Sequence, residues 1–441
     1  MHPLALGIDF GTTNSSVALA TSRGLVELAT YPSAYGPVEA YRSVLYLEQL
    51  TQRGVTNIKS WSGPQAIEQY LAAETKGRLI QSPKSYLSSR TLKGTEVFGR
   101  RMTLEDLIAR ILRDLRESAQ QQFGAKIGTV VVGRPVQFVG AETGDDNDFA
   151  VERLKRAFHL AGFEHVEFEL EPVAAAHSYE AGLDHDELIL IADFGGGTSD
   201  FSLLRVGPRV RQHGRTPKDL LGNAGIGLAG DAFDAKIVRH LVSPALGMGS
   251  SARSMNKILP AVPVWVYKKL EHWHHLSFLR TNSTMNMLRG SLATALEPHQ
   301  IEALIHLVQE DLGYELHRAV QKTKCALSAG VSAEFRFSDG IVDITTRVDR
   351  EEFEGWIAEE LARIESCVDS LLSVSGVSRA DVDVAFLTGG SSFVPAVRRI
   401  FEKRFGADRI RAGNEFTSVA RGLAIRAMDR KAAGGEPVGP L

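Results

Sequence analysis

The 441-residue chain has few cysteines, no excess of charge of one sign and no long apolar run. Its two cysteines, Cys325 and Cys367, are too few for a disulfide scaffold and are typical of a reducing compartment. Fifty Lys plus Arg against 53 Asp plus Glu give a formal net charge of -3, which implies no basic face for nucleic acid. No apolar run approaches the roughly 20 residues of a membrane helix, and the start MHPLALGIDFG has no signal-peptide pattern. We therefore expect a cytoplasmic protein that binds neither nucleic acid nor membrane.

The length and an internal repeat predict two related halves. A chain of 441 residues, 44% of them hydrophobic, is too long for one compact core. Segments 4–20, LALGIDFGTTNSSVALA, and 188–204, LILIADFGGGTSDFSLL, share one layout: an apolar strand, Asp-Phe-Gly, a turn of small residues, a hydroxyl and a second strand. Such self-similarity indicates two related halves that face each other.

Strand and helix patterns alternate along the chain. Apolar residues at helical spacing predict a helix at 104–123, followed by the short strand GTVVVG. The acidic cluster at 145–148 lacks the glycine and terminal glutamate of a calcium loop, so it predicts a loop that caps the following helix. This alternation indicates α/β sheets flanked by helices. Residues from about 245 to 300 show no clear period.

Three glycine-containing turns predict a phosphate site. Because glycine has no side chain, successive amide N–H groups of such a turn can converge on an anion. Asp9 and Asp193, each at the end of a strand, would repel phosphate unless a divalent cation lay between them. Neither hairpin is a Walker loop, since each leads into a strand and lacks Gly-Lys-Ser/Thr. One turn alone would be a hairpin with an exposed acid, but the third turn, LTGGSS at 387–392, favours a magnesium nucleotide.

At this point the sequence resembles the actin-like ATPase superfamily and, within it, the nucleotide-binding domain of Hsp70 chaperones. The resemblance covers nearly the whole chain. GIDFGTTNSSVAL and IADFGGGTSDFSLL resemble the two phosphate motifs, LEPVAAAHSYEAGL the connecting motif, and FLTGGSSFVPAVRRIF the adenosine motif. The implied fold is α/β, of the actin-like ATPase type, with two duplicated ribonuclease H-like lobes flanking a nucleotide cleft.

The resemblance also implies a division of the chain. Lobe I would comprise 1–187, with a small upper subdomain at about 41–106. Lobe II would comprise 188–425, with an enlarged upper subdomain at about 230–346. We expect a helix at about 415–430 to pack back on lobe I, followed by a disordered tail at 431–441.

For the phosphate side, the resemblance implies a site for ATP or ADP with Mg²⁺. The residues expected to surround the phosphates are Gly11, Thr12, Thr13 and Asn14 on one side, and Gly195, Gly196, Gly197 and Thr198 on the other. Asp9 and Asp193 would hold hydrated magnesium, with Glu171 near the attacking water or in the second shell of the metal. Lys84 in RLIQSPKSYL is the best match for the lysine that positions the γ-phosphate and water. Asp200 is either another water-orienting acid or a capping group. Such placement and charge neutralisation are what phosphoryl transfer to water needs.

The adenosine side shows departures from the family. The residues implied by the resemblance are Gly230, Asp231, Lys324, Ser328, Gly389, Gly390, Ser391 and Phe393. Cys325 and Phe393 stand where the family has arginines that pack on the base, and Gln321 replaces a glutamate, so affinity and base preference stay open. In GRPVQF, Pro135 matches a proline that transmits nucleotide state in the family, and Arg134 precedes it.

The resemblance implies a slow, Mg-dependent ATPase that acts as a nucleotide-state switch. Because the sequence ends about 15 residues after LAIRAM, it is most similar to the truncated YegD-like branch, described as chaperones by homology, and we expect no peptide-binding domain. We further expect a monomer with a protein client or partner. The alternatives are a small-molecule kinase of the same superfamily, an actin-like scaffold, and a nucleotide-binding regulator with little catalysis.

Overall fold

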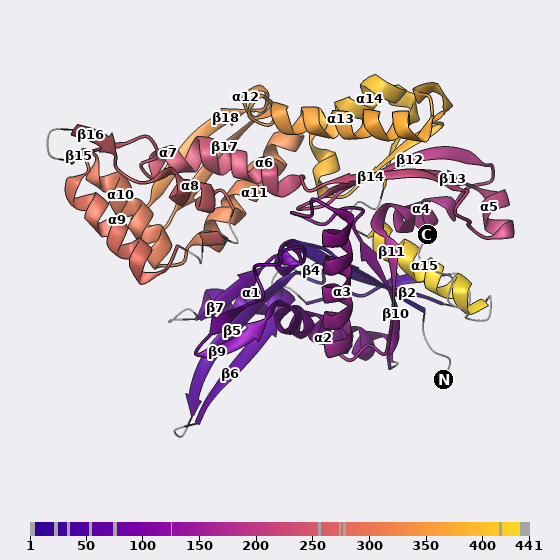
Figure 1. Ribbon diagram of the computed structural model, residues 1–441, viewed down its shortest axis with the longest axis horizontal. Coiled ribbons are helices and arrows are strands. Elements are labelled where there is room, and N and C mark those ends of the chain that lie inside the picture. The colour runs from indigo at the N-terminus through magenta and orange to yellow at the C-terminus, as the bar shows by residue number, and fades with distance from the viewer. Residues whose placement is uncertain are drawn as a thin grey trace. The chain divides into compact units, whose positions relative to one another are not determined.

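The computed structural model describes residues 5–21, 25–32, 36–52, 55–73, 77–124, 126–254, 257–272, 275–276, 279–413 and 417–432. The chain divides into two compact units (Figure 1). Unit 1 comprises Met1–Ala229, Arg363–Ser392 and Val397–Leu441, and unit 2 comprises Gly230–Ala362 and Phe393–Ala396. Both central sheets lie in unit 1. The proposed division into lobes at residue 187 stays a prediction.

The first sheet of unit 1 has the path β11-β10-β1-β2-β3, with β4 paired to β2. Its strands are β1 (Ala5–Phe10), β2 (Asn14–Ala20), β3 (Val26–Leu28), β4 (Tyr41–Arg42), β10 (Thr129–Arg134) and β11 (His165–Leu170). β1 is antiparallel to β2 and parallel to β10, with Ile8 opposite both Val17 and Val132. The hairpin predicted at 4–20 therefore forms the middle of this sheet.

The second sheet has the order β14-β13-β12-β19-β20. Its strands are β12 (Glu187–Phe194), β13 (Ser199–Val206), β14 (Leu220–Ile226), β19 (Val384–Thr388) and β20 (Ile410–Ala412). β12 is antiparallel to β13, with Asp193 opposite Asp200, and parallel to β19. The same local arrangement, a central hairpin beside a parallel strand, thus occurs in both sheets. The internal repeat predicted from the sequence is confirmed.

The helices of unit 1 cover these sheets. They are α1 (Gly63–Ala72), α2 (Leu104–Phe123), α3 (Gly144–Leu160), α4 (Glu171–Glu180), α5 (Pro208–His213) and α15 (Ser418–Ala432). α13 (Ala358–Ser375) and α14 (Pro395–Phe405) begin in unit 2 and end in unit 1. α2 and α3 each begin with a capping box, in which Thr103 pairs with Asp106 and Thr143 with Asp146. The capping role predicted for the cluster at 145–148 is confirmed for Asp146, but these residues form the first turn of α3 and not a loop before it.

α15 packs against β1, β2, β10 and α4, and Figure 1 shows α15 and α4 side by side. Two glycines make these contacts possible. A Cβ on Gly7 would meet the backbone of α15 at Ala420 and Ala424, and one on Gly422 would meet the carbonyl of Ala174 in α4. The small residues thus allow a backbone-to-backbone approach. Residues 433–441 of the predicted tail lie outside the described residues.

A smaller subdomain is inserted between β4 and α2. Its elements are β5 (Val44–Gln52), β6 (Val55–Ser62), β7 (Arg78–Gln81), η1 (Pro83–Tyr86), β8 (Gly94–Val97) and β9 (Arg100–Thr103). β5 lies between β6 and β7 in an antiparallel sheet. The segment leads directly from β7 into η1, which carries Lys84.

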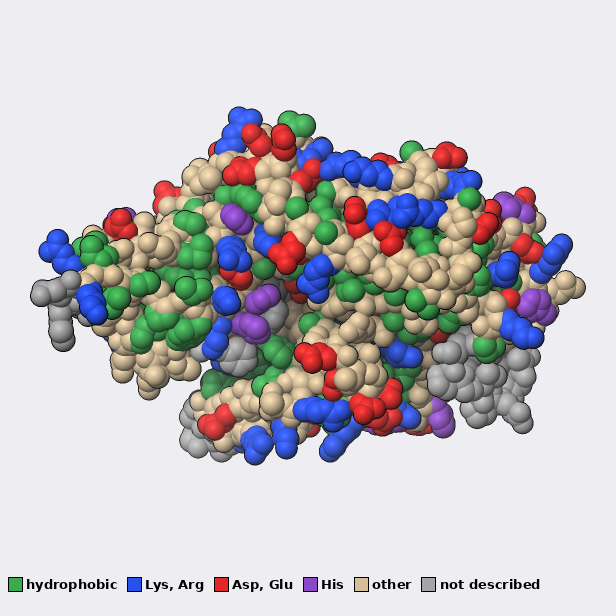
Figure 2. All heavy atoms as spheres, turned by 45° about the horizontal axis from the view of Figure 1, so that its top comes forward, with side chains coloured by type: hydrophobic (Ala, Val, Ile, Leu, Met, Phe, Trp, Pro, Cys, Tyr) green, Lys and Arg blue, Asp and Glu red, His purple; other side chains and the backbone are tan. Residues whose placement is uncertain are grey.

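Unit 2 is mostly helical. Its elements are α6 (Gly230–Ile237), η2 (Val238–Val242), α7 (Ser243–Ala245), β15 (Ser251–Ser254), β16 (Lys257–Pro260), α8 (Val264–Leu270), α9 (Asn282–Thr294), α10 (Pro298–Gln309), α11 (Gly313–Ala329), β17 (Ser332–Ser338), β18 (Asp343–Asp349) and α12 (Arg350–Trp356). The described part of the stretch 245–300, which shows no clear sequence period, forms a hairpin and helices. On the face drawn in Figure 2, acidic and basic side chains are interspersed. Among the described residues, no helix has the length and apolar character to span a membrane.

Candidate functional site

The first glycine turn joins β1 to β2 and is held by the segment after β4. Ser43 donates its hydroxyl to the carbonyl of Gly11 at 2.7 Å, and its backbone N–H to the carbonyl of Thr13 at 2.9 Å. Arg42 donates to the side-chain oxygen of Asn14 at 3.2 Å. A Cβ on Gly11 would meet the carbonyl of Asn14, so the turn requires glycine there. The sequence analysis did not identify Ser43 as part of the site, because a single serine outside any motif gives no signal.

The second turn, between β12 and β13, faces the first. The N–H of Gly195 donates to the carbonyl of Thr198 at 2.9 Å and closes the turn. A Cβ on Gly197 would lie 3.5 Å from the hydroxyl oxygen of Thr12 and 2.8 Å from a methyl of Val139. The two phosphate motifs of the sequence therefore approach each other, and the loop after β10 lies against the second one.

The third turn, after β19, contacts the second. Gly389 has a φ of +82°, and a Cβ there would meet the backbone of Phe194. Ser391 donates its hydroxyl to the carbonyl of Gly195 at 3.4 Å. Gly390 and Ser391 belong to a short 3-10 helix, η5 (Gly390–Phe393). All three turns of unit 1 thus meet at one place.

A buried ion pair lies beside these turns. Lys84 donates from Nζ to Oε1 of Glu171 at 2.7 Å, although 87 positions separate the two residues. Their side chains are only 6% and 9% exposed. Burial disfavours the charged amine of Lys84, but the carboxylates of Glu171 and Asp9 outweigh it and raise the pKa of Lys84. The lysine is therefore held in its charged form next to the acids.

Three aspartates share this environment. Burial, with repulsion from Glu171, raises the pKa of Asp9 to about 7. Burial and the same carboxylate raise the pKa of Asp193 well above its usual range. Asp200 is 1% exposed, and burial raises its pKa to about 7. Ionising all of these acids together is unfavourable without further positive charge.

The side chain of Asp200 accepts hydrogen bonds from backbone N–H groups. Its Oδ1 accepts the backbone N–H groups of Val136 at 2.7 Å and Gln137 at 3.3 Å. Of the two alternatives predicted for this residue, the structure shows a capping contact. Asp200 ties β13 to the loop after β10.

The acids fit a hydrated divalent cation. The carboxylates of Asp9, Asp193 and Glu171 supply oxygen donors, which Mg²⁺ prefers, and one lysine does not balance their charge. Among the described residues, no group of three or more His, Cys, Asp or Glu side chains could hold a metal ion by itself. Magnesium usually keeps several water ligands and contacts one or two carboxylates, and Asp9 and Asp193 can supply these.

The residues predicted for the adenosine side divide between the units. Gly389, Gly390 and Ser391 lie in unit 1, whereas the others lie in unit 2. Within unit 2, Lys324 pairs with Asp234 at 2.8 Å and donates to the carbonyl of Gly230 at 3.3 Å. The sequence reasoning missed Asp234, although AGDAFD places two acids three positions apart on α6.

Three further adenosine-side residues also lie in unit 2. Ser328 donates its hydroxyl to the carbonyl of Lys324 at 3.0 Å. Asp231 stands in the first turn of α6. Phe393 is 50% exposed. Their roles in binding stay predictions.

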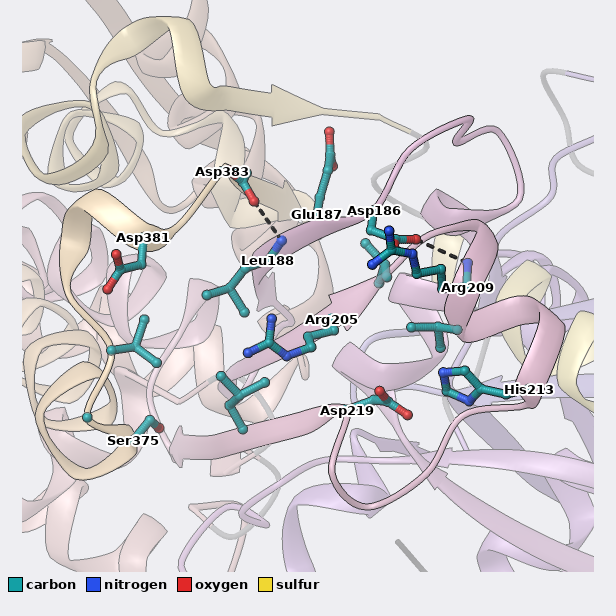
Figure 3. Close-up of a pocket in the computed structure, with 15 residues that line it drawn as sticks. Asp186, Glu187, Leu188, Arg205, Arg209, His213, Asp219, Ser375, Asp381 and Asp383 are labelled. Atoms are coloured by element: carbon teal, nitrogen blue, oxygen red, sulfur yellow. Dashed lines mark hydrogen bonds and ion pairs between the residues drawn. The ribbon is translucent and has the colours of Figure 1, made fainter.

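A pocket lies at the end of the second sheet away from these turns, with a volume of about 650 Å³ (Figure 3). It is bounded by the start of β12 and the end of β13, where Leu188 is opposite Arg205. Its acids make local contacts: Asp186 pairs with Arg209 at 3.2 Å, and Asp383 accepts the N–H of Leu188 at 2.8 Å. Nothing in the sequence pattern indicated this pocket.

A protein-family model described as "Hsp70 protein" matches residues 49–250 and 300–432. The chain belongs to the Hsp70 family. Its fold is accordingly the α/β fold of the actin-like ATPases, as the sequence predicted. The chain is also similar to "Chaperone protein DnaK" of Thermosipho africanus (strain TCF52B), at 25% identity over 437 residues, which cover 96% of this chain and 58% of that relative. The chain thus spans little more than half the length of that relative. The finer resemblance to the YegD-like branch stays a prediction.

Proposed function

We propose that this Hsp70-family chain binds ATP with Mg²⁺, hydrolyses it slowly to ADP and phosphate, and uses the nucleotide state as a switch in a chaperone. The observation that carries the proposal is the meeting of three glycine turns beside the Lys84–Glu171 pair, the partly buried Asp9 and the buried Asp193. Amides of such turns suit phosphate oxygens, and the adjacent acids call for a cation. Family membership and the similarity to a DnaK chaperone support the same activity.

Different residues of this site would have different roles in binding and hydrolysis. Backbone N–H groups of the turns would bind the phosphates, and the hydroxyl of Thr198 lies at the end of the second turn. Asp9 and Asp193 would hold magnesium, which supplies charge neutralisation at the phosphates when bound. Lys84 would position the terminal phosphate. Glu171, oriented by Lys84 at 2.7 Å, would orient a water molecule for attack.

The adenosine side is proposed from the resemblance alone. Its residues would be Gly230, Asp231, Lys324, Ser328, Gly389, Gly390, Ser391 and Phe393. A protein client or partner, bound differently in the two nucleotide states, would be the target of the switch. Comparing proteins captured by the ATP-bound and ADP-bound chain tests this part, since equal capture in both states would contradict a switch.

The decisive test of the site is the substitution Asp193→Ala. Because Asp193 would contact the cation directly, we expect turnover of ATP to fall by about 100-fold or more while the far-UV circular dichroism stays that of the wild type. A matched control is Asp343→Ala, which removes an exposed carboxylate from β18 in unit 2. Unaltered turnover in Asp193→Ala would refute the assignment, as would an equal loss in the control.

A further inference from the structure

Arg134 ends β10 at the same edge of the first sheet as the proposed phosphate site. The parallel register of β1 and β10 pairs Ile8 with Val132, so Asp9 and Arg134 both follow at the carboxyl ends of their strands. On the other side, Arg134 is opposite Leu170, the residue directly before Glu171. Ligands of such sheets bind at this edge.

The direction of the Arg134 side chain follows from strand alternation. Val130 and Val132 pack in the core formed with α2 and α3, so Arg134, two positions further, leaves the sheet on that same face. Tyr86 and Leu87, two and three positions after Lys84, pack in this core too. The segment that carries Lys84 therefore packs on the same face of the sheet as Arg134.

The backbone after Arg134 is fixed against the second phosphate turn. Val136 and Gln137 donate their N–H groups to Asp200, which follows that turn on β13. Val139 lies against Gly197 of the turn itself. Arg134 is thus held beside the turn by the chain that continues from it.

The guanidinium of Arg134 makes no ion pair with a described residue. Its one hydrogen bond is long, 3.5 Å from Nη1 to the carbonyl of Pro135. Burial lowers the pKa of Arg134, although the carboxylates of Asp148, Glu171 and Asp200 act in the opposite sense from a distance. An arginine nevertheless keeps its charge.

Two well-buried arginine side chains of unit 1 have carboxylate partners. Arg153 pairs with Glu105, and Arg215 with Glu180 at 2.6 Å. A desolvated guanidinium is costly unless an anion pairs with it. Arg134 therefore lacks the counter-ion that its surroundings call for, and it lies where the proposed function puts phosphate.

We propose that Arg134 contacts the terminal phosphate of the bound nucleotide and thereby distinguishes ATP from ADP. The inference rests on the proposed function. The planar guanidinium matches two phosphate oxygens at once, which an ammonium group cannot do. Because Glu171 already pairs with Lys84, Arg134 supplies positive charge that is not otherwise committed.

The test measures binding rather than turnover. Titration calorimetry of the full chain with Mg²⁺ compares ADP with a non-hydrolysable β,γ-imido analogue of ATP, in the wild type, Arg134→Gln and Arg134→Lys. We expect Arg134→Gln to weaken the binding of the analogue by about tenfold or more and the binding of ADP by less than about twofold. The affinity of Arg134→Lys for the analogue should lie between those of the wild type and Arg134→Gln, since lysine keeps the charge but cannot donate two parallel hydrogen bonds. Inorganic phosphate added to the ADP complex provides a further arm, and Arg134→Gln should abolish any binding of that phosphate.

The control is Arg205→Gln, at the pocket of Figure 3. Arg205 is an exposed arginine at the far end of the second sheet, and its loss should leave both affinities unchanged. The role of Arg134 is refuted if the wild type binds both nucleotides and Arg134→Gln changes the two affinities equally or changes neither. A wild type that binds neither nucleotide would overturn the proposed function and this inference together.

Discussion

Neutralising Asp9 should stabilise the nucleotide-free protein. The carboxylate of Asp9 is partly buried and lies near Glu171, and this environment raises its pKa from 3.8 to about 7. The substitution Asp9→Asn keeps the size of the side chain and removes the charge at every pH. If Asp9 binds a cation, its charge destabilises the folded chain when no cation is bound, because only the cation compensates that charge.

The magnitude follows from the shift in pKa. A rise of about three pH units corresponds to about 4 kcal/mol, since each unit is about 1.4 kcal/mol. Between about pH 4 and pH 7 the folded chain holds a proton on Asp9 that the unfolded chain has released, so the free energy of unfolding falls as the pH rises through this window. The advantage of Asp9→Asn over the wild type should therefore be below about 1 kcal/mol near pH 4 and approach about 4 kcal/mol at pH 8.

The assay is urea denaturation of both proteins across this pH range, with a chelator and without nucleotide. Asp343→Asn, which changes an exposed acid on β18, should match the wild type throughout. The same Asp9→Asn protein should bind ATP with Mg²⁺ more weakly. The reasoning fails if Asp9→Asn is no more stable than the wild type at pH 8, or if the difference does not depend on pH.

Three other substitutions test the contacts around the site. Lys84→Met should lower the free energy of unfolding by about 3–5 kcal/mol, because it leaves the carboxylate of Glu171 buried and unpaired; an unchanged free energy of unfolding in urea denaturation would contradict this. Gly389→Ala should cost about 2 kcal/mol or more, because the φ of +82° is strained for alanine and Phe194 blocks its Cβ; an unchanged Tm would argue against it. Asp200→Ala should leave two backbone N–H groups without their acceptor at a cost of about 1–3 kcal/mol, seen as faster hydrogen exchange at 136–137, and unchanged exchange there would exclude the tie.

The sequence predicted the fold well because its strongest signals are local. The two Asp-Phe-Gly hairpins form the middle of two sheets, as their repeated layout indicated. The acidic cluster in the first turn of α3 caps that helix through Asp146. The sequence could not reveal that Asp234 pairs with Lys324, because helices and loops separate the two residues along the chain.

The sequence by itself determined where the chain turns and which residue types line those turns. Glycine at 11 is required by the close approach of the Asn14 carbonyl three positions further on, which local sterics decide. Only the tertiary structure decided the partners of the charged side chains. It paired Lys84 with Glu171, engaged Asp200 with two backbone N–H groups, and left Arg134 without a carboxylate. Ion pairs depend on which distant segments fold together, because a charge interacts through space and not along the chain.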